Sequence, residues 1–453
     1  MISDLARPYQ RRAIDFIRDK GIAYLAVDMA MGKTFMALSA AAMSGKPIMV
    51  IGPISAINIT WPAELQKWFP NLSYRILHGP SKTIKDIHKI DVILINYEGL
   101  PWFCKQTCKW VKRCIILDES QMVKNHDTTR FKILKQMHNM WVEPRVCLSA
   151  TPATRSLHDL WSQYYLLDQG ARLGKNISSF RATYCRAVSW PGQGFTEYRI
   201  TQDAETQIPE KVADITFRLS VDDLLSLPPY MHNKIELDLP GKLRAAYDTL
   251  VNTGLFEYNT ISFQCTNPAQ QRSVTRQFIQ GGFYDKSKKW VNVNNAKISV
   301  LLEMLETINR NAIVTYQYRG ELELIRKELK DASILSGTTP RAEVRSIIDK
   351  WNDGRIKVLF VQVDIKLQGL NLQTGGSDII WGALPWSLES FIQLSGRLRR
   401  PGQQADKVRM HYLLYKDTID MRIYDALQAK QNVQNAVLSY FAANTKSFME
   451  QEQ

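Results

Sequence analysis

The sequence predicts an α/β protein with two doubly wound parallel-sheet lobes and a helical insertion between them. First, 453 residues exceed what one hydrophobic core usually organises. Second, short apolar stretches alternate with amphipathic helical stretches in two separate blocks, as in sheets covered on both faces. Third, the interval between the blocks is polar, mainly helical in pattern and punctuated by prolines. We expect an N-terminal lobe at 1–225, a helical insertion and hinge at 226–293 and a C-terminal lobe at 294–453.

The N-terminal lobe is expected to begin with a helix opened by Pro8 that turns Ala13, Ile14 and Ile17 inward. Apolar stretches that end in polar or glycine-containing residues follow it and predict strands. These strands are Ile22–Val27, Ile48–Ile51, Val92–Ile95, Cys114–Leu117 and Val146–Leu148. Ligands of open α/β sheets bind at the carboxyl ends of the strands, so functional residues are expected in the loops that leave them.

The C-terminal lobe repeats the alternation from about Lys297, with a helix through Leu301, Leu302 and Leu305. Its predicted strands are Ala312–Thr315, Ser333–Leu335, Lys357–Val361 and Asp378–Trp381. Lysines and arginines of the insertion and this lobe alternate with aromatic residues. Phosphate contact by the basic groups is plausible, while the aromatic spacing favours core packing over base stacking. The basic residues include Arg272, Arg276, Lys286, Lys288 and Lys289, and the aromatic ones are Phe278, Phe283, Tyr284 and Trp290.

Charge and cysteine content restrict the partner and the compartment. The chain has 58 Lys and Arg against 44 Asp and Glu, a net charge of +14, which favours a polyanionic partner. Six scattered cysteines and no apolar leader predict a reducing, intracellular compartment. This is the cytoplasm of a bacterium or infected host cell, or the nucleus of a eukaryote. No apolar stretch approaches the roughly 20 residues of a membrane span, so no membrane partner is expected.

A phosphate-binding loop is predicted where D-M-A-M-G-K-T, at 28–34, joins an apolar strand to a helix. Gly32 lets the backbone approach the phosphates, with Met31 beside it in the loop, and Lys33 brings a positive charge to the β and γ groups. Thr34 can hold Mg²⁺ while helix N-terminal amides face the anion. Val27 stands where the full Walker pattern has a glycine, so this motif alone leaves the assignment open.

A second motif, C-I-I-L-D-E-S-Q at 114–121, is an apolar strand that ends in two adjacent carboxylates. Such a pair at the tip of a buried strand is costly without a cation. Asp118 is the candidate Mg²⁺ ligand, and Glu119 is the candidate general base for the attacking water. Together the two motifs predict hydrolysis of ATP or GTP.

A series of further motifs follows in order along the chain, and together they resemble the Swi/Snf-type helicase-like ATPases of superfamily two. The motifs are A-R-P-Y-Q at 6–10, I-G-P-I-S at 51–55, N-Y-E-G-L at 96–100, V-K-N at 123–125, L-S-A-T-P-A-T at 148–154, F-R-L-S-V-D-D-L-L-S-L-P-P at 217–229, Q-G-L-N-L at 368–372 and Q-L-S-G-R-L-R-R-P-G-Q at 393–403. The resemblance implies two RecA-like lobes, ATP and Mg²⁺ as cofactors, and double-stranded or forked DNA as partner.

The resemblance also implies roles for individual residues. Catalytic roles fall to Lys33, Asp118, Glu119, Arg397 and Arg400, and ATP binding to Gln10, Met31, Gly32, Lys33, Thr34 and Gln393. Coupling is implied for Gln121, Ser149, Thr151 and Gly369, and DNA contact for Pro53, Trp61, Lys124 and Asn371. Arg397 and Arg400 are three apart on a predicted helix, so they share a face and suit arginine fingers.

Several positions depart from the family pattern. Ala30 replaces a usual glycine in the phosphate loop, and Gln121 replaces the usual histidine after the acidic pair. Lys366 and Leu367 stand where paired glycines are common. We expect hydrolysis to survive these changes, while its coupling to DNA is altered.

The leading hypothesis is a DNA-stimulated ATPase that translocates on double-stranded DNA, with fork remodelling or re-annealing as a specific possibility. One alternative is a helicase that separates DNA or RNA strands, because the core motifs are shared across the superfamily. Another is an ATP-gated clamp on nucleic acid with weak turnover. Intact Lys33, Glu119, Arg397 and Arg400 argue against the clamp.

Overall fold

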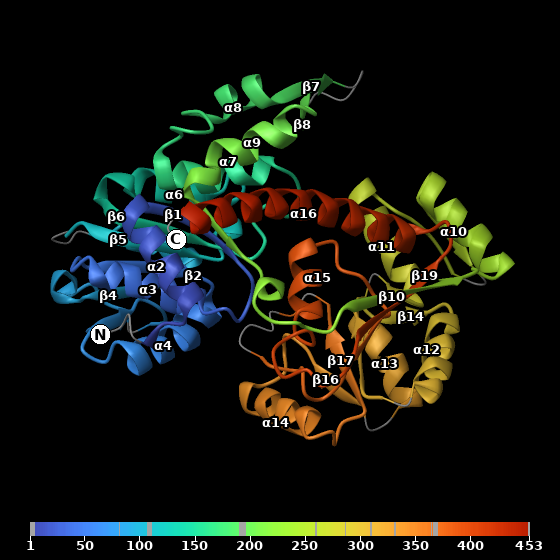
Figure 1. Cartoon of the computed structure of the whole chain (residues 1–453). Coiled ribbons are helices and arrows are strands. Elements are labelled where there is room, and N and C mark those ends of the chain that lie inside the picture. The colour runs from blue at the N-terminus through green and yellow to red at the C-terminus, as the bar shows by residue number, and fades with distance from the viewer. Residues whose placement is uncertain are drawn as a thin grey trace. The chain divides into compact units, whose positions relative to one another are not determined.

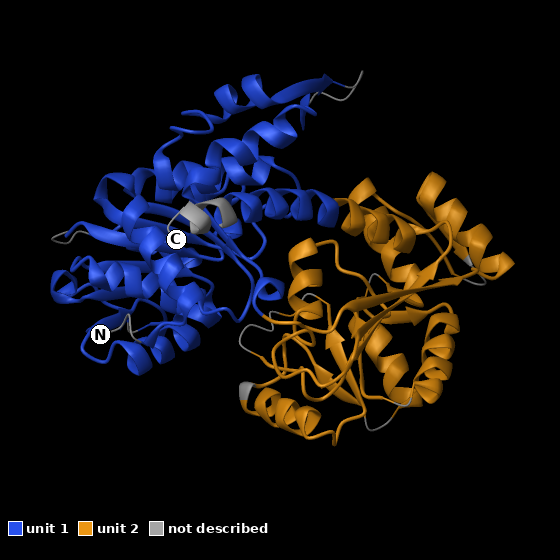
Figure 2. Cartoon of the chain, viewed as in Figure 1, with its two compact units in different colours: residues 1–224, 430–453 blue, residues 225–429 orange. Residues whose placement is uncertain are grey.

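The computed structural model describes residues 5–80, 82–106, 111–189, 196–258, 261–285, 287–308, 310–329, 332–363, 365 and 370–451 (Figure 1). The chain forms two compact units (Figure 2). Unit 1 contains Met1–Leu224 and Lys430–Gln453, and unit 2 contains Leu225–Ala429. The chain therefore passes from one unit to the other twice.

Unit 1 is built on a seven-stranded sheet in the order β3-β4-β2-β5-β6-β1-β9. All neighbouring strands in it are parallel. The strands are β1 (Ile22–Val27), β2 (Ile48–Gly52), β3 (Tyr74–Ile76), β4 (Val92–Asn96), β5 (Arg113–Asp118), β6 (Trp141–Leu148) and β9 (Thr216–Leu219). The five strands predicted for this lobe are all present. Their apolar sequences suit a parallel sheet, whose strands are buried on both faces.

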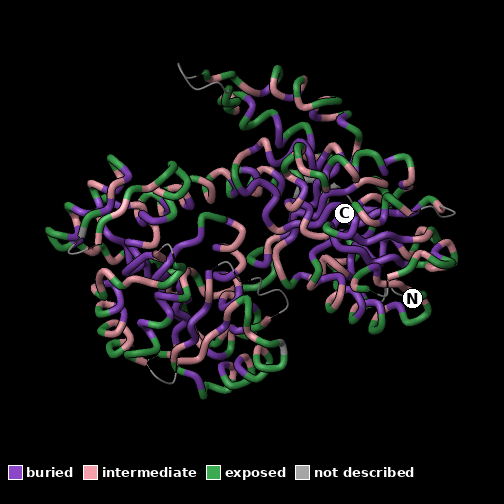
Figure 3. The backbone as a smooth tube through the Cα atoms, turned by 180° about the vertical axis from the view of Figure 1, so that it is seen from behind, coloured by how far each residue is buried: buried purple, intermediate pink, exposed green. Residues whose placement is uncertain are grey.

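Most helices of unit 1 lie around this sheet, and an antiparallel hairpin projects away from it (Figure 1). The helices are α2 (Pro8–Lys20), α3 (Lys33–Met43), α4 (Trp61–Trp68), α5 (Leu100–Phe103), α6 (Thr129–Met137), α7 (His158–Asp168), α8 (Ile177–Tyr184) and α9 (Ala204–Val212), and the hairpin is β7 (Cys185–Ser189) with β8 (Thr196–Ile200). The central strands β2 and β4 are buried throughout, and α3 and α7 are largely buried, whereas the residues of the β7–β8 hairpin are exposed or half-exposed (Figure 3).

Unit 2 has a six-stranded parallel sheet in the order β10-β19-β18-β15-β17-β16. Its strands are β10 (Tyr230–Leu237), β15 (Ala312–Tyr316), β16 (Ser333–Leu335), β17 (Val358–Gln362), β18 (Asp378–Trp381) and β19 (Val408–Tyr415). Its helices are α12 (Ala296–Thr307), α13 (Arg319–Glu328), α14 (Arg341–Asn352) and α15 (Leu388–Ser395). The predicted fold class, an α/β protein with two parallel-sheet lobes, is confirmed.

The interval between the two predicted lobes contains α10 (Gly241–Thr253) and α11 (Pro268–Ile279), as expected, and also strands. These are β10 in the main sheet and two hairpins, β11 (Leu255–Tyr258) with β12 (Ile261–Gln264) and β13 (Gly282–Tyr284) with β14 (Trp290–Asn292). Phe278 and Phe283 are buried, which agrees with the packing interpretation of the aromatics. Arg272, Lys288 and Lys289 are exposed, and Lys286 lies outside the described residues.

Helix α16 (Ile419–Gln451) begins in unit 2, and its residues from Lys430 onward belong to unit 1. Val437 and Phe441 on this second half are buried in the core of unit 1. The part of α16 that follows the second lobe in sequence therefore completes the first unit. Among the residues that the structure describes, no helix has the length and apolar character needed to cross a membrane.

Candidate nucleotide-binding site

The two predicted nucleotide motifs meet at one edge of the unit 1 sheet. The phosphate loop leaves the carboxyl end of β1, and Asp118 ends β5. β1 and β5 lie on either side of β6, and all three are parallel. The loop after β6, which begins at Ser149, leaves the same edge between them. This is the edge at which open α/β sheets bind ligands.

Gly32 shapes the phosphate loop. It precedes α3 with a φ of 82°, in the left-handed region that favours glycine. A Cβ at Gly32 would lie 2.5 Å from Nε2 of Gln10, so a side chain there would displace the Gln10 amide. Gln10 Nε2 donates to the Met31 carbonyl at 3.4 Å. Ala30 has a φ of 64°, in the same left-handed region, which carries a steric cost for a residue with a side chain.

Lys33 lies at the carboxyl end of β1. Its ammonium donates to the carbonyls of Val27 at 2.7 Å and Asp28 at 3.0 Å. Burial lowers the pKa of Lys33, while the nearby carboxyl groups of Glu119 and Asp28 act in the opposite direction. Thr34 follows in the first turn of α3, beside the amides that a helix N-terminus presents to phosphate.

Asp118 is held by two aromatic residues. Trp61 Nε1 donates to Asp118 Oδ2 at 2.9 Å, and the Tyr97 hydroxyl donates to the Asp118 carbonyl at 2.9 Å. Burial, and then the neighbouring Glu119, raise the pKa of Asp118 to about 6. A divalent cation would reverse that penalty. The Asp118 carboxylate and the Thr34 hydroxyl are the hard oxygen ligands that Mg²⁺ prefers, so this donor set fits the ion.

A buried hydrogen-bond chain runs from Glu119 to the loop after β6. Gln121 Nε2 donates to Glu119 Oε2 at 2.7 Å, and the Ser149 hydroxyl donates to Gln121 Oε1 at 2.7 Å. The Thr151 amide then donates to Ser149 Oγ at 3.0 Å. Gln121 and Ser149 are buried. An amide offers both a donor and an acceptor, so Gln121 makes the two contacts that a histidine at this position could make.

The residues with predicted DNA contacts have different surroundings. Trp61 is fully buried, and its indole donates to Asp118, so it helps to position the acidic pair. Pro53, which follows β2, is also buried. Lys124 is half-buried and donates to Thr154 Oγ1, which in turn donates to the buried Asp159 at 3.1 Å. Asn371 in unit 2 is exposed.

The arginine motif of unit 2 corrects one prediction. Gln393 lies on α15 and donates to Glu389 at 3.2 Å, but α15 ends at Ser395. Arg397 and Arg400 therefore lie in the turn after the helix and not on a helix face. Gly396 follows the last helical residue and Pro401 lies shortly beyond, and both residue types commonly end helices.

The two arginine side chains nevertheless converge. Arg397 Nη1 and Arg400 Nη1 donate to the Leu370 carbonyl at 3.1 and 3.2 Å, and Arg400 also donates to Asn371 Oδ1 at 2.8 Å. Both arginines are more than nine-tenths buried. Gly369, Lys366 and Leu367 lie outside the described residues.

Unit 1 thus brings together Gln10, Met31, Gly32, Lys33, Asp118, Glu119, Gln121, Ser149 and Thr151, and unit 2 brings together Arg397, Arg400 and Asn371. The roles of these residues stay predictions.

The sequence analysis did not predict that Tyr97 contacts Asp118, although Tyr97 lies in the motif at 96–100. It also missed the contact between Asp28 and Arg218, which are 190 positions apart.

Two family profiles match this chain in succession. The SNF2-related domain matches residues 9–287, and the helicase conserved C-terminal domain matches residues 296–402. Protein p41 of Acyrthosiphon pisum secondary endosymbiont phage 1 is 29% identical, over 95% of this chain and 97% of its own.

Two longer relatives are similar over 95% of this chain. YwqA of Bacillus subtilis, named as an ATP-dependent helicase/translocase, is 24% identical, and human ZRANB3, named as a DNA annealing helicase and endonuclease, is 25% identical. The match spans 48% of YwqA and 40% of ZRANB3. Because the SNF2-related profile alone matches well over half of the chain, this protein belongs to the SNF2-related family of helicase-like ATPases.

Proposed function

We propose that this ATPase is stimulated by DNA and translocates on double-stranded DNA. The observation that carries the proposal is the buried chain from Glu119 through Gln121 to Ser149. An ATPase that only turns over nucleotide does not need its general base hydrogen-bonded to a second loop of the sheet. A motor needs such a connection, because hydrolysis must change the shape of the protein.

In this proposal the residues of unit 1 bind and hydrolyse ATP. The α3 amides and Lys33 hold the phosphates, and Gln10, whose side chain donates to the Met31 carbonyl, is the proposed base-recognising residue. Glu119 accepts a proton from water as the water oxygen bonds to the γ-phosphorus and the bond to ADP breaks. Thr34 and Asp118 would hold Mg²⁺, which neutralises phosphate charge when bound. Arg397 and Arg400 are the proposed cations for charge on the transferred group.

Binding to the DNA backbone is supported by charge. The chain carries a net charge of +14. In unit 2, a polar cavity of about 630 Å³ is lined by Arg319, Arg326 and Lys350, with two glutamates also present. Hydroxyls of the loop after β16 share the lining, and they belong to Ser336, Thr338 and Thr339. Cations and hydroxyls of this kind contact phosphates without reading bases, as a translocating protein requires.

Forked or re-annealing DNA is the more specific substrate that we propose, supported by the name of the relative ZRANB3, a DNA annealing helicase. The similarity to a phage protein over 95% of the chain supports a bacterial or viral source, and hence action in the cytoplasm.

The test is steady-state ATP hydrolysis with no nucleic acid and then with single-stranded DNA, blunt duplex, forked duplex or RNA. Each is supplied at equal nucleotide concentration and fixed salt, because phosphate contacts are salt-dependent. Glu119→Gln serves as the control for contaminating ATPases. Blunt or forked duplex should stimulate most. Stimulation only by single strands or RNA would replace the proposal with a strand-separating helicase, and none at all would favour a clamp.

A further inference from the structure

Asp28, at the junction of β1 and the phosphate loop, is held by a buried arginine. Arg218 Nη1 lies 2.6 Å from Asp28 Oδ1, and the Arg218 side chain is 8% exposed. Asp28 Oδ2 accepts from the Ser220 hydroxyl at 3.0 Å and the Val221 amide at 3.1 Å. Burial opposes ionisation, but Arg218 and these donors outweigh it and leave the pKa of Asp28 below its ordinary value. The carboxylate is therefore charged at neutral pH.

The same pair fixes the strand ends on which the phosphate loop rests. Arg218 Nη1 also donates to the carbonyls of Ala26 at 2.9 Å and Leu219 at 3.1 Å. The Asp28 amide donates to the Leu219 carbonyl at 3.1 Å. The Asp28 carbonyl accepts from the Lys33 ammonium at 3.0 Å. One residue thus contacts the phosphate-binding lysine through its backbone and Arg218 through its side chain.

Segments that continue from both covalent connections between the units contact Asp28 or Arg218. The first connection leaves unit 1 at Leu224, three residues after Val221, which bonds to Asp28. The second is α16, which enters unit 1 at Lys430. On α16 the buried Thr445 hydroxyl accepts from the Arg218 amide at 2.9 Å. The phosphate loop, the outgoing chain and the returning helix therefore all contact one of two paired residues within unit 1, and the helix does so through the Arg218 backbone amide.

We propose that Asp28 and Arg218 form a positioning pair that transmits the position of the phosphate loop to both connections, and so links nucleotide binding to movement of the units. This inference rests on the proposed function only in requiring that the units move when nucleotide binds. An ion pair that only stabilises the fold can be replaced by apolar residues of similar volume. Here the second carboxylate oxygen bonds to the outgoing chain, a contact that apolar residues do not reproduce.

The experiment measures energy transfer between a dye on α2 of unit 1 and a dye on α12 of unit 2, before and after a non-hydrolysable ATP analogue. Binding of the analogue is measured separately by its own fluorescence. The variants are Asp28→Asn, Arg218→Gln and the double variant. A milder variant, Ser220→Ala, removes one hydrogen bond without leaving a buried charge unpaired.

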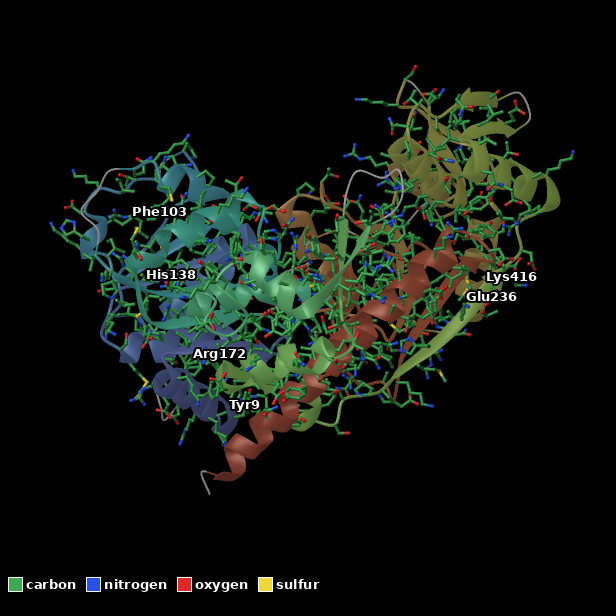
Figure 4. The ribbon with its side chains drawn as sticks, turned by 90° about the horizontal axis from the view of Figure 1, so that it is seen from above. Tyr9, Phe103, His138, Arg172, Glu236 and Lys416 are labelled. Carbon is green, nitrogen blue, oxygen red and sulfur yellow. The ribbon has the colours of Figure 1, made fainter. Side chains whose placement is uncertain are left out.

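Asp168→Asn is the matched control. Asp168 is a buried carboxylate at the end of α7, paired at 3.1 Å with Arg172, which is labelled in Figure 4. Its loss removes a comparable buried ion pair, but Asp168 lies outside the phosphate loop and both connections.

Asp28→Asn should bind the analogue within about threefold of wild type while its transfer change falls at least about fivefold. Ser220→Ala should lose part of the change, and Asp168→Asn should keep it. The double variant should melt at a higher temperature than either single variant, because no charge is left unpaired, but should not recover the transfer change.

The inference would be overturned if Asp28→Asn and Ser220→Ala both kept the wild-type change in energy transfer. It would also be overturned if Asp168→Asn lost as much of that change as Asp28→Asn. A wild-type protein whose energy transfer does not change on nucleotide binding would overturn it as well. Loss of analogue binding in Asp28→Asn would also overturn it, because Asp28 would then be a binding residue. If wild type shows the transfer change but no stimulation by duplex DNA, the translocase proposal fails while the positioning pair stands.

Discussion

At the level of single residues, substitutions of Glu119 and Lys33 should distinguish ATP turnover from nucleotide binding. Glu119→Gln removes the proposed proton acceptor, so ATP turnover should fall about 10²–10⁴-fold while nucleotide binding persists. Lys33→Ala removes the ammonium proposed to bind phosphate, so binding itself should be lost. Turnover and binding of a fluorescent nucleotide are measured in parallel. Wild-type turnover in Glu119→Gln would show that Glu119 is not the general base.

Substitution of Asp118 should change activity and stability in opposite directions. Its pKa, about 6 in the folded protein against an ordinary 3.8, means that the native state retains a proton that the unfolded chain releases. Its stabilising contribution is full below 3.8 and is lost as the pH rises through 6. At pH 7 without Mg²⁺, Asp118→Asn should therefore be more stable than wild type by roughly 1–3 kcal/mol in urea unfolding, yet inactive.

Asp15→Asn is the control for this prediction, because Asp15 is an exposed carboxylate on α2 whose removal leaves the acidic pair intact. Its stability should follow the wild-type pH profile. If Asp118→Asn were less stable than wild type at pH 7, the charged Asp118 carboxylate would not destabilise the folded state.

Gln121 connects two loops, so its removal should affect coupling more than chemistry. In Gln121→Ala the ratio of duplex-stimulated to basal ATP turnover should fall about 10–100-fold, as expected for losing a hydrogen bond to a charged group. Gln121→His should keep the ratio within a few-fold, because imidazole also carries one donor and one acceptor. Gln66→Ala, which removes an exposed amide bonded to Tyr74, is the control. An unchanged ratio in Gln121→Ala would exclude the relay.

At the level of elements, the strands predicted from sequence are continuous apolar stretches, whereas β9 and β19 were missed although they are largely buried, because charged or polar residues interrupt them. Ile48–Gly52 and Ala312–Tyr316 are buried throughout, and such strands appear in sequence as continuous apolar stretches. β10 was missed because most of its side chains are exposed or half-exposed and polar, and its pairing partner β19 lies far along the chain. Arg397 and Arg400 were placed on a helix because their spacing fits one, although Gly396 ends it.

The second half of α16 should contribute strongly to the stability of unit 1. Phe441 is fully buried in the unit 1 core, so Phe441→Ala should lower the free energy of unfolding by about 3–5 kcal/mol in urea titrations. Ser439→Ala, an exposed change on the same helix, should stay within about 0.5 kcal/mol of wild type. A Phe441→Ala variant as stable as wild type would mean that α16 does not pack on unit 1 in solution.

At the level of the whole molecule, the sequence predicted candidate groups for a site because the chemistry restricts the residue types: a lysine for phosphate, paired carboxylates for Mg²⁺ and water, and arginines for charge. It did not identify the contacts that hold these groups in place. Trp61 on Asp118 and Arg218 on Asp28 join segments 57 and 190 positions apart, and no local pattern marks them. Only the folded sheet brings these segments together.

Movement along duplex DNA is the central claim, and displacement of a third strand from a DNA triplex tests it most directly. A translocating motor that enters from the flanking duplex pushes the third strand off without separating the two strands beneath it. We predict ATP-dependent release of the third strand by wild type and none by Glu119→Gln. Failure of wild type to release it, under conditions where duplex DNA stimulates its ATP hydrolysis, would contradict translocation.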